Sequence, residues 1–301
     1  MTLSCYPDAR QLGPIEDITE AALGNIIDAD PDCNILVLGG PPCQDVSLLN
    51  VGRKGAFGNR SSFRTHFTRV FDLCMLKAKT TVVGLMECTR MDAADRVECD
   101  AVFGRPPFEI CSQWWQPITR PRWWWFSTEV TFHDARIGPS ATDKKVLVVE
   151  PQVERNHWSN NLQPGWQPVA GEKALFSCLT RHTPKSKPMF APRGIDKCNA
   201  EDLRRWKADQ FSQAPYQYQD KNLVVNRRGT KRRLTAEEEE KMQGMQVGTT
   251  AAVIPTARSS TEAERRRKSL LGNAWHVQVA TFCLQALLAP WLVPVVRTDV
   301  P

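Results

Sequence analysis

One stretch near the start of the chain, residues 34–47, restricts the fold more than any other. Residues 34–38 are mostly aliphatic, and two glycines and two prolines follow them before Cys43. A short aliphatic run that ends at glycines is typical of a buried strand. The prolines stiffen the chain directly before Cys43, so its thiol is expected just beyond the carboxyl end of a strand, where open α/β sheets bind ligands. The alternative is a strand that ends in a Gly-Pro turn and happens to hold a buried thiol.

Further strands and helices follow at spacings that suit an α/β protein. Residues 81–86 form a second buried run, which ends at Glu87, and residues 108–115 are predicted to form a third strand. Apolar residues recur at helical spacing over residues 63–78, and residues 277–288 form an apolar closing helix that we expect to pack back on the sheet. Glu87 is therefore expected one strand away from Cys43, although a solvated acid at a strand end is the common alternative.

A strand is predicted over residues 122–126. The Arg-x-Arg step of residues 120–122 leads into it, and aromatic residues follow. Because side chains alternate along a strand, Arg120, Arg122 and Trp124 are expected on one face, with Trp123 and Trp125 on the other. Two guanidinium groups that face the cysteine loop could bind a carbonyl oxygen and a phosphate. The tryptophans are predicted to be core residues, and we expect this strand at an antiparallel edge of the sheet.

The bulk composition is that of a globular protein in a reducing compartment. The 301 residues are 42% hydrophobic and 24% charged, and the net charge of +6 permits a polyanionic partner. The ten cysteines contain no Cys-x-x-Cys pair and the five histidines show no ligand spacing, so we expect neither a disulfide framework nor a metal site. The first residues lack the apolar core of a secretion signal, and polar residues and a proline interrupt the apolar region 277–296, which predicts a soluble protein.

In their order along the chain, these segments resemble the DNA cytosine-5 methyltransferases, and especially the animal de novo type. The resemblance covers residues 17–288, with the middle aligned only loosely. It rests on Pro42-Cys43-Gln44, on Arg53-Lys54-Gly55, on Glu87-Cys88-Thr89 where the family has Glu-Asn-Val, on Arg120-Pro121-Arg122, on Leu179-Thr180-Arg181 and on Leu271-Gly272-Asn273-Ala274-Trp275. In the family, a Phe-x-Gly-x-Gly loop holds the methionine end of the cofactor. This motif does not occur before residue 34, where the first glycine is Gly13.

The resemblance implies a truncated Rossmann-like sheet of the S-adenosylmethionine-dependent methyltransferases with a small target-recognition lobe. We expect residues 1–127 to form the catalytic α/β domain without its first strands, residues 128–261 to form the recognition lobe, and residues 262–301 to return to the catalytic domain. An exposed sheet edge would follow from missing first strands.

Residues 14–19 are predicted to be a strand end. Thr19 is predicted to cap a helix over residues 20–27, and Thr235 with Glu238 to form a capping box.

The resemblance also implies a role for each matching residue. Cys43 would be the nucleophile that adds to cytosine C6, Glu87 would donate to ring N3, and Arg122 would hold the base carbonyl with support from Arg120. The cofactor S-adenosyl-L-methionine would lie against Asp17, Ile18, Pro42, Asn273, Ala274 and Trp275. The DNA would contact Gln44, Ser47, Arg53, Lys54 and Arg181. No metal is implied.

Double-stranded DNA is the partner that the resemblance implies, with a methyltransferase-like protein as a further partner and no membrane. Basic pairs and runs at residues 204–205, 227–228 and 231–233 would suit DNA phosphates, although such runs can also be solvated or serve nuclear import. The expected location is the nucleus. Two other functions stay open as alternatives: an inactive methyltransferase-like protein that binds DNA or regulates a partner, and a thiol hydrolase or redox enzyme, for which the sequence offers no companion histidine or resolving cysteine.

Overall fold

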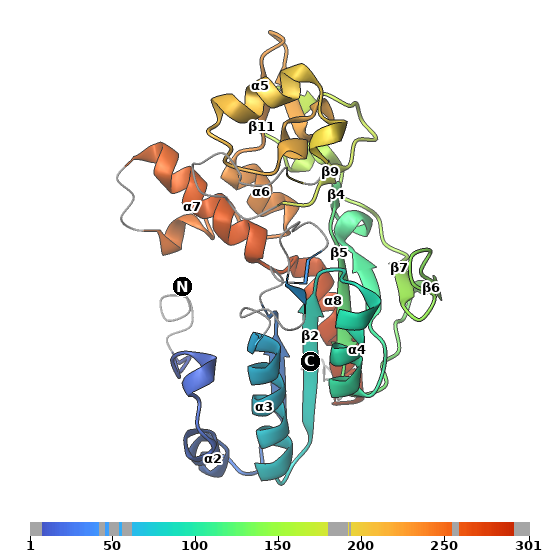
Figure 1. Ribbon diagram of the computed structural model, residues 1–301, viewed down its shortest axis with the longest axis vertical. Coiled ribbons are helices and arrows are strands. Elements are labelled where there is room, and N and C mark those ends of the chain that lie inside the picture. Colours follow the sequence, from blue (N-terminus) through green and yellow to red (C-terminus); the bar gives the residue numbers. More distant parts are fainter. Residues whose placement is uncertain are drawn as a thin grey trace, which may run out of the picture.

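The larger lobe of the molecule is built on a six-stranded sheet, and a smaller lobe adjoins it (Figure 1). The computed structural model describes residues 8–41, 46–47, 54–55, 62–179, 192, 194–254 and 259–291. The sheet has the order β1-β2-β5-β3-β7-β6. Its strands are β1 (Ile35–Gly39), β2 (Val82–Cys88), β3 (Phe108–Cys111), β5 (Pro121–Phe126), β6 (Ala135–Pro139) and β7 (Leu147–Pro151). The pairings make β1, β2, β3 and β7 run in one direction and β5 and β6 in the other, so the predicted mostly parallel α/β sheet is confirmed.

Helices cover both faces of this sheet. On one face, α2 (Glu20–Ala29), α3 (Ser62–Lys77) and α4 (Ala93–Phe103) pack their apolar side chains against β2 and β5. On the other face lies α8 (Val277–Leu288), which buries Val279, Cys283 and Leu287 against the sheet. The predicted return of the last helix to the sheet is therefore confirmed. No helix in the described part of the chain is long and apolar enough to cross a lipid bilayer.

The strand that carries Arg122 is antiparallel, as predicted, but it lies inside the sheet rather than at its edge. β5 pairs with β2 on one side and with β3 on the other. Its side chains explain this position: Trp123 and Trp125 are buried under α3 and α4, while Trp124 and Phe126 are buried under α8. A strand that is apolar on both faces is stable only where both faces are covered. The predicted alternation of the tryptophans between the two faces is confirmed.

Two other local predictions were wrong. The strand predicted for residues 108–115 ends at Cys111, because the buried Ser112 hydroxyl donates a hydrogen bond to the carbonyl of Ile118 (2.9 Å) and the chain turns there. Residues 14–19 form a 3-10 helix, η1 (Ile15–Asp17), and not a strand end. Arg69 of α3 explains its position, since its guanidinium donates to the carbonyls of Ile18 (2.5 Å) and Ile15 (2.7 Å).

A smaller lobe follows the sheet and has its own core. Its sheet has the order β11-β10-β8, and the short strands β4 and β9 pair beside it. Ile118, Phe176, Val224, Met242 and Leu271 form the centre of this core. The elements of the lobe are β4 (Ile118–Thr119), β8 (Trp166–Pro168), β9 (Phe176–Ser177), α5 (Ala200–Ala208), β10 (Leu223–Asn226), β11 (Lys231–Arg233), α6 (Ala236–Met242) and α7 (Ser260–Asn273). The boundary between the two domains at residues 127 and 128 stays a prediction. β6 and β7, which follow residue 128 in the chain, belong to the large sheet.

Candidate active site

The candidate site lies where β1 and β2 end side by side. Gly39, the last residue of β1, pairs with Met86, and Glu87 follows on β2. Gly40 then passes so close to its neighbours that a Cβ placed on it would lie 2.6 Å from the Trp275 Nε1 atom and 3.5 Å from the Glu87 Oε2 atom. The backbone before Pro41 is therefore packed against the indole of Trp275 and the carboxylate of Glu87.

Glu87 forms an ion pair with Arg122 across the sheet. The Arg122 Nε atom lies 2.8 Å from Glu87 Oε1, and the two side chains are 15% and 11% exposed, respectively. Glu87 pairs in register with Trp124, and Arg122 is two residues from Trp124 on β5, so the two side chains project from the same face. The structure therefore brings together the acid and the second arginine that the sequence predicted.

Arg120 is buried deeper than Arg122 and binds the protein itself. Its side chain is 4% exposed and donates to the carbonyl oxygens of Ala274 (2.8 Å), Gly272 (3.4 Å) and Leu179 (3.4 Å). These contacts connect the start of β5 to the junction between α7 and α8 and to the segment after β9. The Arg-x-Arg segment, the Gly-Asn-Ala-Trp segment and the Leu-Thr-Arg segment thus meet at one guanidinium group.

Cys178 also belongs to this cluster, although the sequence prediction did not include it. Its sulfur lies 3.4 Å from Arg120 Nη1 and 3.5 Å from Arg122 Nη2. Burial alone would raise the pKa of the thiol, but the two guanidinium groups outweigh it and hold the pKa below the usual value. Its place follows from the structure: the strand β9 ends directly before it and pairs with β4, and so lies beside the segment that leads to Arg120.

Several predicted site residues lie outside the described part of the chain, namely Pro42, Cys43, Gln44, Arg53 and Arg181. Their roles stay predictions. Of the other residues predicted to contact DNA, Lys54 is exposed, whereas Ser47 is only 9% exposed.

The described residues predicted to hold the cofactor come from two separate segments. Asp17, the last residue of η1, is exposed, and Ile18, directly after it, is half-buried and bound by Arg69 of α3. At the junction of α7 and α8, Asn273 is exposed, whereas Ala274 and Trp275 are half-buried. Trp275 lines the site through its contact with Gly40, and the Ala274 carbonyl accepts a hydrogen bond from Arg120.

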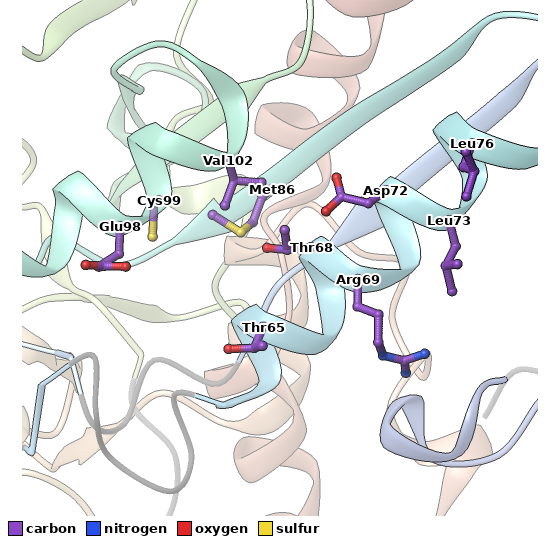
Figure 2. Close-up of a pocket in the computed structure, with 10 residues that line it drawn as sticks. All are labelled: Thr65, Thr68, Arg69, Asp72, Leu73, Leu76, Met86, Glu98, Cys99 and Val102. Carbon is purple, nitrogen blue, oxygen red and sulfur yellow. The ribbon is translucent and has the colours of Figure 1, made fainter. Parts of the chain in front are cut away.

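A cavity of about 530 Å³ lies between α3 and α4, beside the site rather than in it (Figure 2). Its lining includes Thr68 and Asp72 of α3, Val102 of α4 and Met86 of β2, and none of the predicted site residues. Figure 2 shows the Arg69 side chain pointing away from α4, in agreement with its bonds to η1.

Most of the predicted basic surface is already paired with acids. Arg204 binds Glu201, Arg205 binds Asp202, and Lys231 binds Asp220. Arg232 and Arg233 likewise pair with acidic side chains. Arg227 and Arg228, at the exposed turn between β10 and β11, make no ion pair with a described residue. The turn is therefore the part of this basic surface that is best suited to bind a phosphate.

Comparisons with known proteins show the fold. The structure of the Entamoeba histolytica methyltransferase EhMeth matches over 96% of this chain and 86% of that one, with a TM-score of 0.55 and 14% sequence identity. The crystal structure of S. pombe Dnmt2 methyltransferase matches over 97% of this chain and 87% of that one, with a TM-score of 0.48 and 15% identity. This chain shares its fold with the methyltransferase EhMeth. No family model and no curated protein sequence matches it. The resemblance to the animal de novo type stays a prediction.

Proposed function

We propose that this chain is a DNA cytosine-5 methyltransferase. The observation that carries the proposal is the buried Glu87–Arg122 ion pair, which lies directly beside Gly40 and thus beside the segment that leads to Cys43. Supporting observations are the fold shared with EhMeth and the meeting of three predicted motifs at Arg120.

In the proposed reaction, the thiolate of Cys43 adds to C6 of a cytosine that has rotated out of the helix. Glu87 holds a proton at ring N3, and Arg122 orients Glu87 and binds the base carbonyl. Electron density then reaches C5, which would take the methyl group that the bound cofactor supplies. A water molecule would accept the C5 proton, and the electron pair of the C5–H bond would expel the thiolate. Arg120 positions Arg122 by fixing the start of β5 to the α7–α8 junction.

S-adenosyl-L-methionine, when bound, supplies an electrophilic methyl group. Asp17, Ile18, Pro42, Asn273, Ala274 and Trp275 would hold it. The close contact between Gly40 and the Trp275 indole fits this role, because the indole forms a rigid apolar wall beside the end of β1. The exposed turn at Arg227 and Arg228 would bind DNA phosphates and help to offset the cost of unstacking the base.

An inactive, DNA-binding or regulatory protein is the second candidate. It was favoured by Cys88, which stands where the resembled family has an asparagine. In the structure Cys88 is 1% exposed and belongs to the core under α3 and α4. Its side chain therefore lies on the opposite face from Glu87, so the replacement affects the core and leaves the Glu87–Arg122 pair in place.

Covalent trapping on DNA that contains 5-fluorocytosine tests the proposal. The fluorine blocks the last elimination, so a methyl-transferring enzyme stays attached to the base. We expect a denaturation-resistant adduct that requires S-adenosylmethionine and is lost in the Cys43→Ser variant. An adduct that persists in this variant would rule out the assigned nucleophile. Absence of an adduct, together with cofactor binding no tighter than millimolar, would support the inactive alternative.

A further inference from the structure

Among the described residues, the candidate site holds two buried guanidinium groups and one carboxylate that pairs with them. Arg120 and Arg122 bring two guanidinium groups, and Glu87 pairs with Arg122 alone among the described residues. Arg120 is 4% exposed, and its partners in the described part of the chain are three carbonyl oxygens and the sulfur of Cys178. A buried cation without a counter-ion is strongly destabilising, so an anion is expected against Arg120.

Cys178 is the group in position to supply that anion. Its sulfur contacts both guanidinium groups, at 3.4 Å from Arg120 and 3.5 Å from Arg122. The carbonyl oxygen of Leu179, 3.2 Å from the sulfur, could accept the proton of a neutral thiol, but one carbonyl dipole is a weaker partner than two cations. With Cys178 as a thiolate, the described residues of the cluster carry two cations and two anions.

We propose that Cys178 is a second reactive thiolate of this site and that peroxides oxidise it to a sulfenic acid. The residue as a whole is half-buried, so only a small movement of the surrounding chain is needed for a small oxidant to reach the sulfur. This inference goes beyond the proposed methyl transfer and does not depend on it.

The chemistry balances with one peroxide molecule. The thiolate sulfur attacks one peroxide oxygen, so an S–O bond forms as the O–O bond breaks. The sulfur loses two electrons and the peroxide gains them. The departing hydroxide or alkoxide takes a proton from water, and Arg120 and Arg122 lie where they can stabilise its charge as it leaves.

The chain contains an internal reference for the test. Cys33 is exposed, and its sulfur donates a hydrogen bond to Asp30 Oδ2 (2.8 Å), which raises the pKa of the Cys33 thiol. Exposure to solvent favours reaction at Cys33, whereas the lowered thiol pKa favours reaction at Cys178. A comparison of the two in one sample separates these effects.

The reduced full-length chain is pulsed with iodoacetamide at pH 6.5, and the labelling rate of each cysteine peptide is measured by mass spectrometry. We expect Cys178 to react at least about tenfold faster than Cys33. In the Arg122→Gln variant, checked for folding by circular dichroism, this ratio should fall.

A second sample is treated with hydrogen peroxide and dimedone, which should mark Cys178 and leave the Cys178→Ser variant unmarked at this position. A wild-type ratio of one or less, or no dimedone adduct on Cys178, would overturn the proposal.

Discussion

The side chain of Glu87 has two neighbours with different roles. Arg122 holds its carboxylate, and the Gly40 backbone packs beside it. A carboxylate in this place is therefore oriented before any substrate arrives, which is the condition for efficient proton transfer. The same burial also makes the residue matter for stability, since loss of its charge leaves Arg122 without its acidic partner.

We expect Glu87→Gln to lower methyl transfer by at least about 100-fold, because the amide keeps the shape but cannot hold the proton at N3. The variant should also lose about 2 kcal/mol of unfolding free energy, since the buried ion pair is broken. Methyl incorporation into DNA and urea unfolding measure the two effects.

Glu109→Gln is the matched control. Glu109 is also a buried carboxylate of the large sheet, but it faces α4 and binds Arg90 (2.6 Å) and the Trp123 indole (3.1 Å). We expect a similar loss of stability with methyl transfer retained. Equal losses of transfer in the two variants would show that Glu87 has only a structural role.

Gly40→Ala should disturb the site through a contact and not through backbone strain. The added Cβ would lie 2.6 Å from Trp275 Nε1, so the indole must move. We expect a loss of about 1–3 kcal/mol in unfolding free energy and a shift in tryptophan fluorescence. Gly24→Ala is the control, because nothing lies within 4 Å of its added Cβ in the helix α2. That variant should gain up to about 1 kcal/mol, and a loss of equal size in both would contradict the steric argument.

At the scale of elements, α6 presents three consecutive glutamates that are all buried but differently paired. Glu238 binds Arg232 (2.7 Å) and completes the capping box with Thr235. Glu240 accepts bonds from Arg267 (3.0 Å), Gly248 N (2.7 Å) and Thr250 N (2.7 Å). Among the described residues, the cations nearest to Glu239 are Lys268 at 3.7 Å and Arg233 at 3.8 Å. This short helix is therefore fixed by side-chain contacts to β11, to the following loop and to α7.

The pKa shifts of these glutamates have opposite signs. Burial would raise the pKa of Glu238 and Glu240, but their bonded partners outweigh it and hold both values below the usual range. For Glu239 burial dominates and raises the pKa. A lowered pKa contributes stability above the unfolded value of about 4.3, which is lost as the pH falls. A raised pKa does the reverse, so the charged form of Glu239 costs stability at neutral pH.

Glutamine substitutions at the three positions should therefore differ. At pH 7 we expect Glu240→Gln and Glu238→Gln to lose about 3 kcal/mol each, because the half-buried cations Arg267 and Arg232 lose their buried acidic partners. Glu239→Gln should lose less than about 1 kcal/mol or gain stability, since it removes the cost of a poorly paired buried charge. Urea unfolding of the three variants provides the measurement. A loss for Glu239→Gln as large as for Glu240→Gln would show that the longer ion pairs are stronger than their distances indicate.

The sequence predicted those elements whose signals are local. The helix of residues 277–288, the caps at Thr19 and Thr235 and the alternation of the tryptophans follow from neighbouring residues, and the structure has them. The place of β5 within the sheet depends on which strands flank it, and this is set by packing between distant segments. The turn at Ser112 depends on a bond to Ile118, which no period in the sequence reveals.

At the scale of the whole molecule, the large sheet and the small lobe are joined by buried polar groups around the α7–α8 junction. Arg120 binds Gly272 and Ala274, Val277 N donates to the Gln243 carbonyl (2.9 Å), and the Gln243 side chain donates to Leu271 (2.9 Å). The motifs that meet there could be found in the sequence one by one. Cys178 could not be assigned to the site, because its importance arises from two arginines more than 50 positions away in the chain.

His276 lies in the same junction and should make the stability of the whole chain depend on pH. Its ring is 2% exposed, and neither nitrogen has a well-formed hydrogen bond to a described residue. Burial, with a contribution from the nearby charge of Arg120, lowers the pKa of His276 to about 3. The unfolded chain, with a histidine pKa of about 6.5, binds the proton first, so stability is full above that pH and falls as the pH drops toward the folded value.

We therefore expect the unfolding free energy to fall by about 2 kcal/mol between pH 7 and pH 5. The lowered pKa values of Glu238 and Glu240 keep these two glutamates charged over this range. Acid should thus weaken the junction between sheet and lobe before it weakens α6. Urea unfolding at the two pH values measures the loss, and the His276→Gln variant is the control, because its amide does not titrate. If the variant loses as much stability as the wild-type chain over this range, another group causes the dependence and the buried ring is not the acid-sensitive point of the fold.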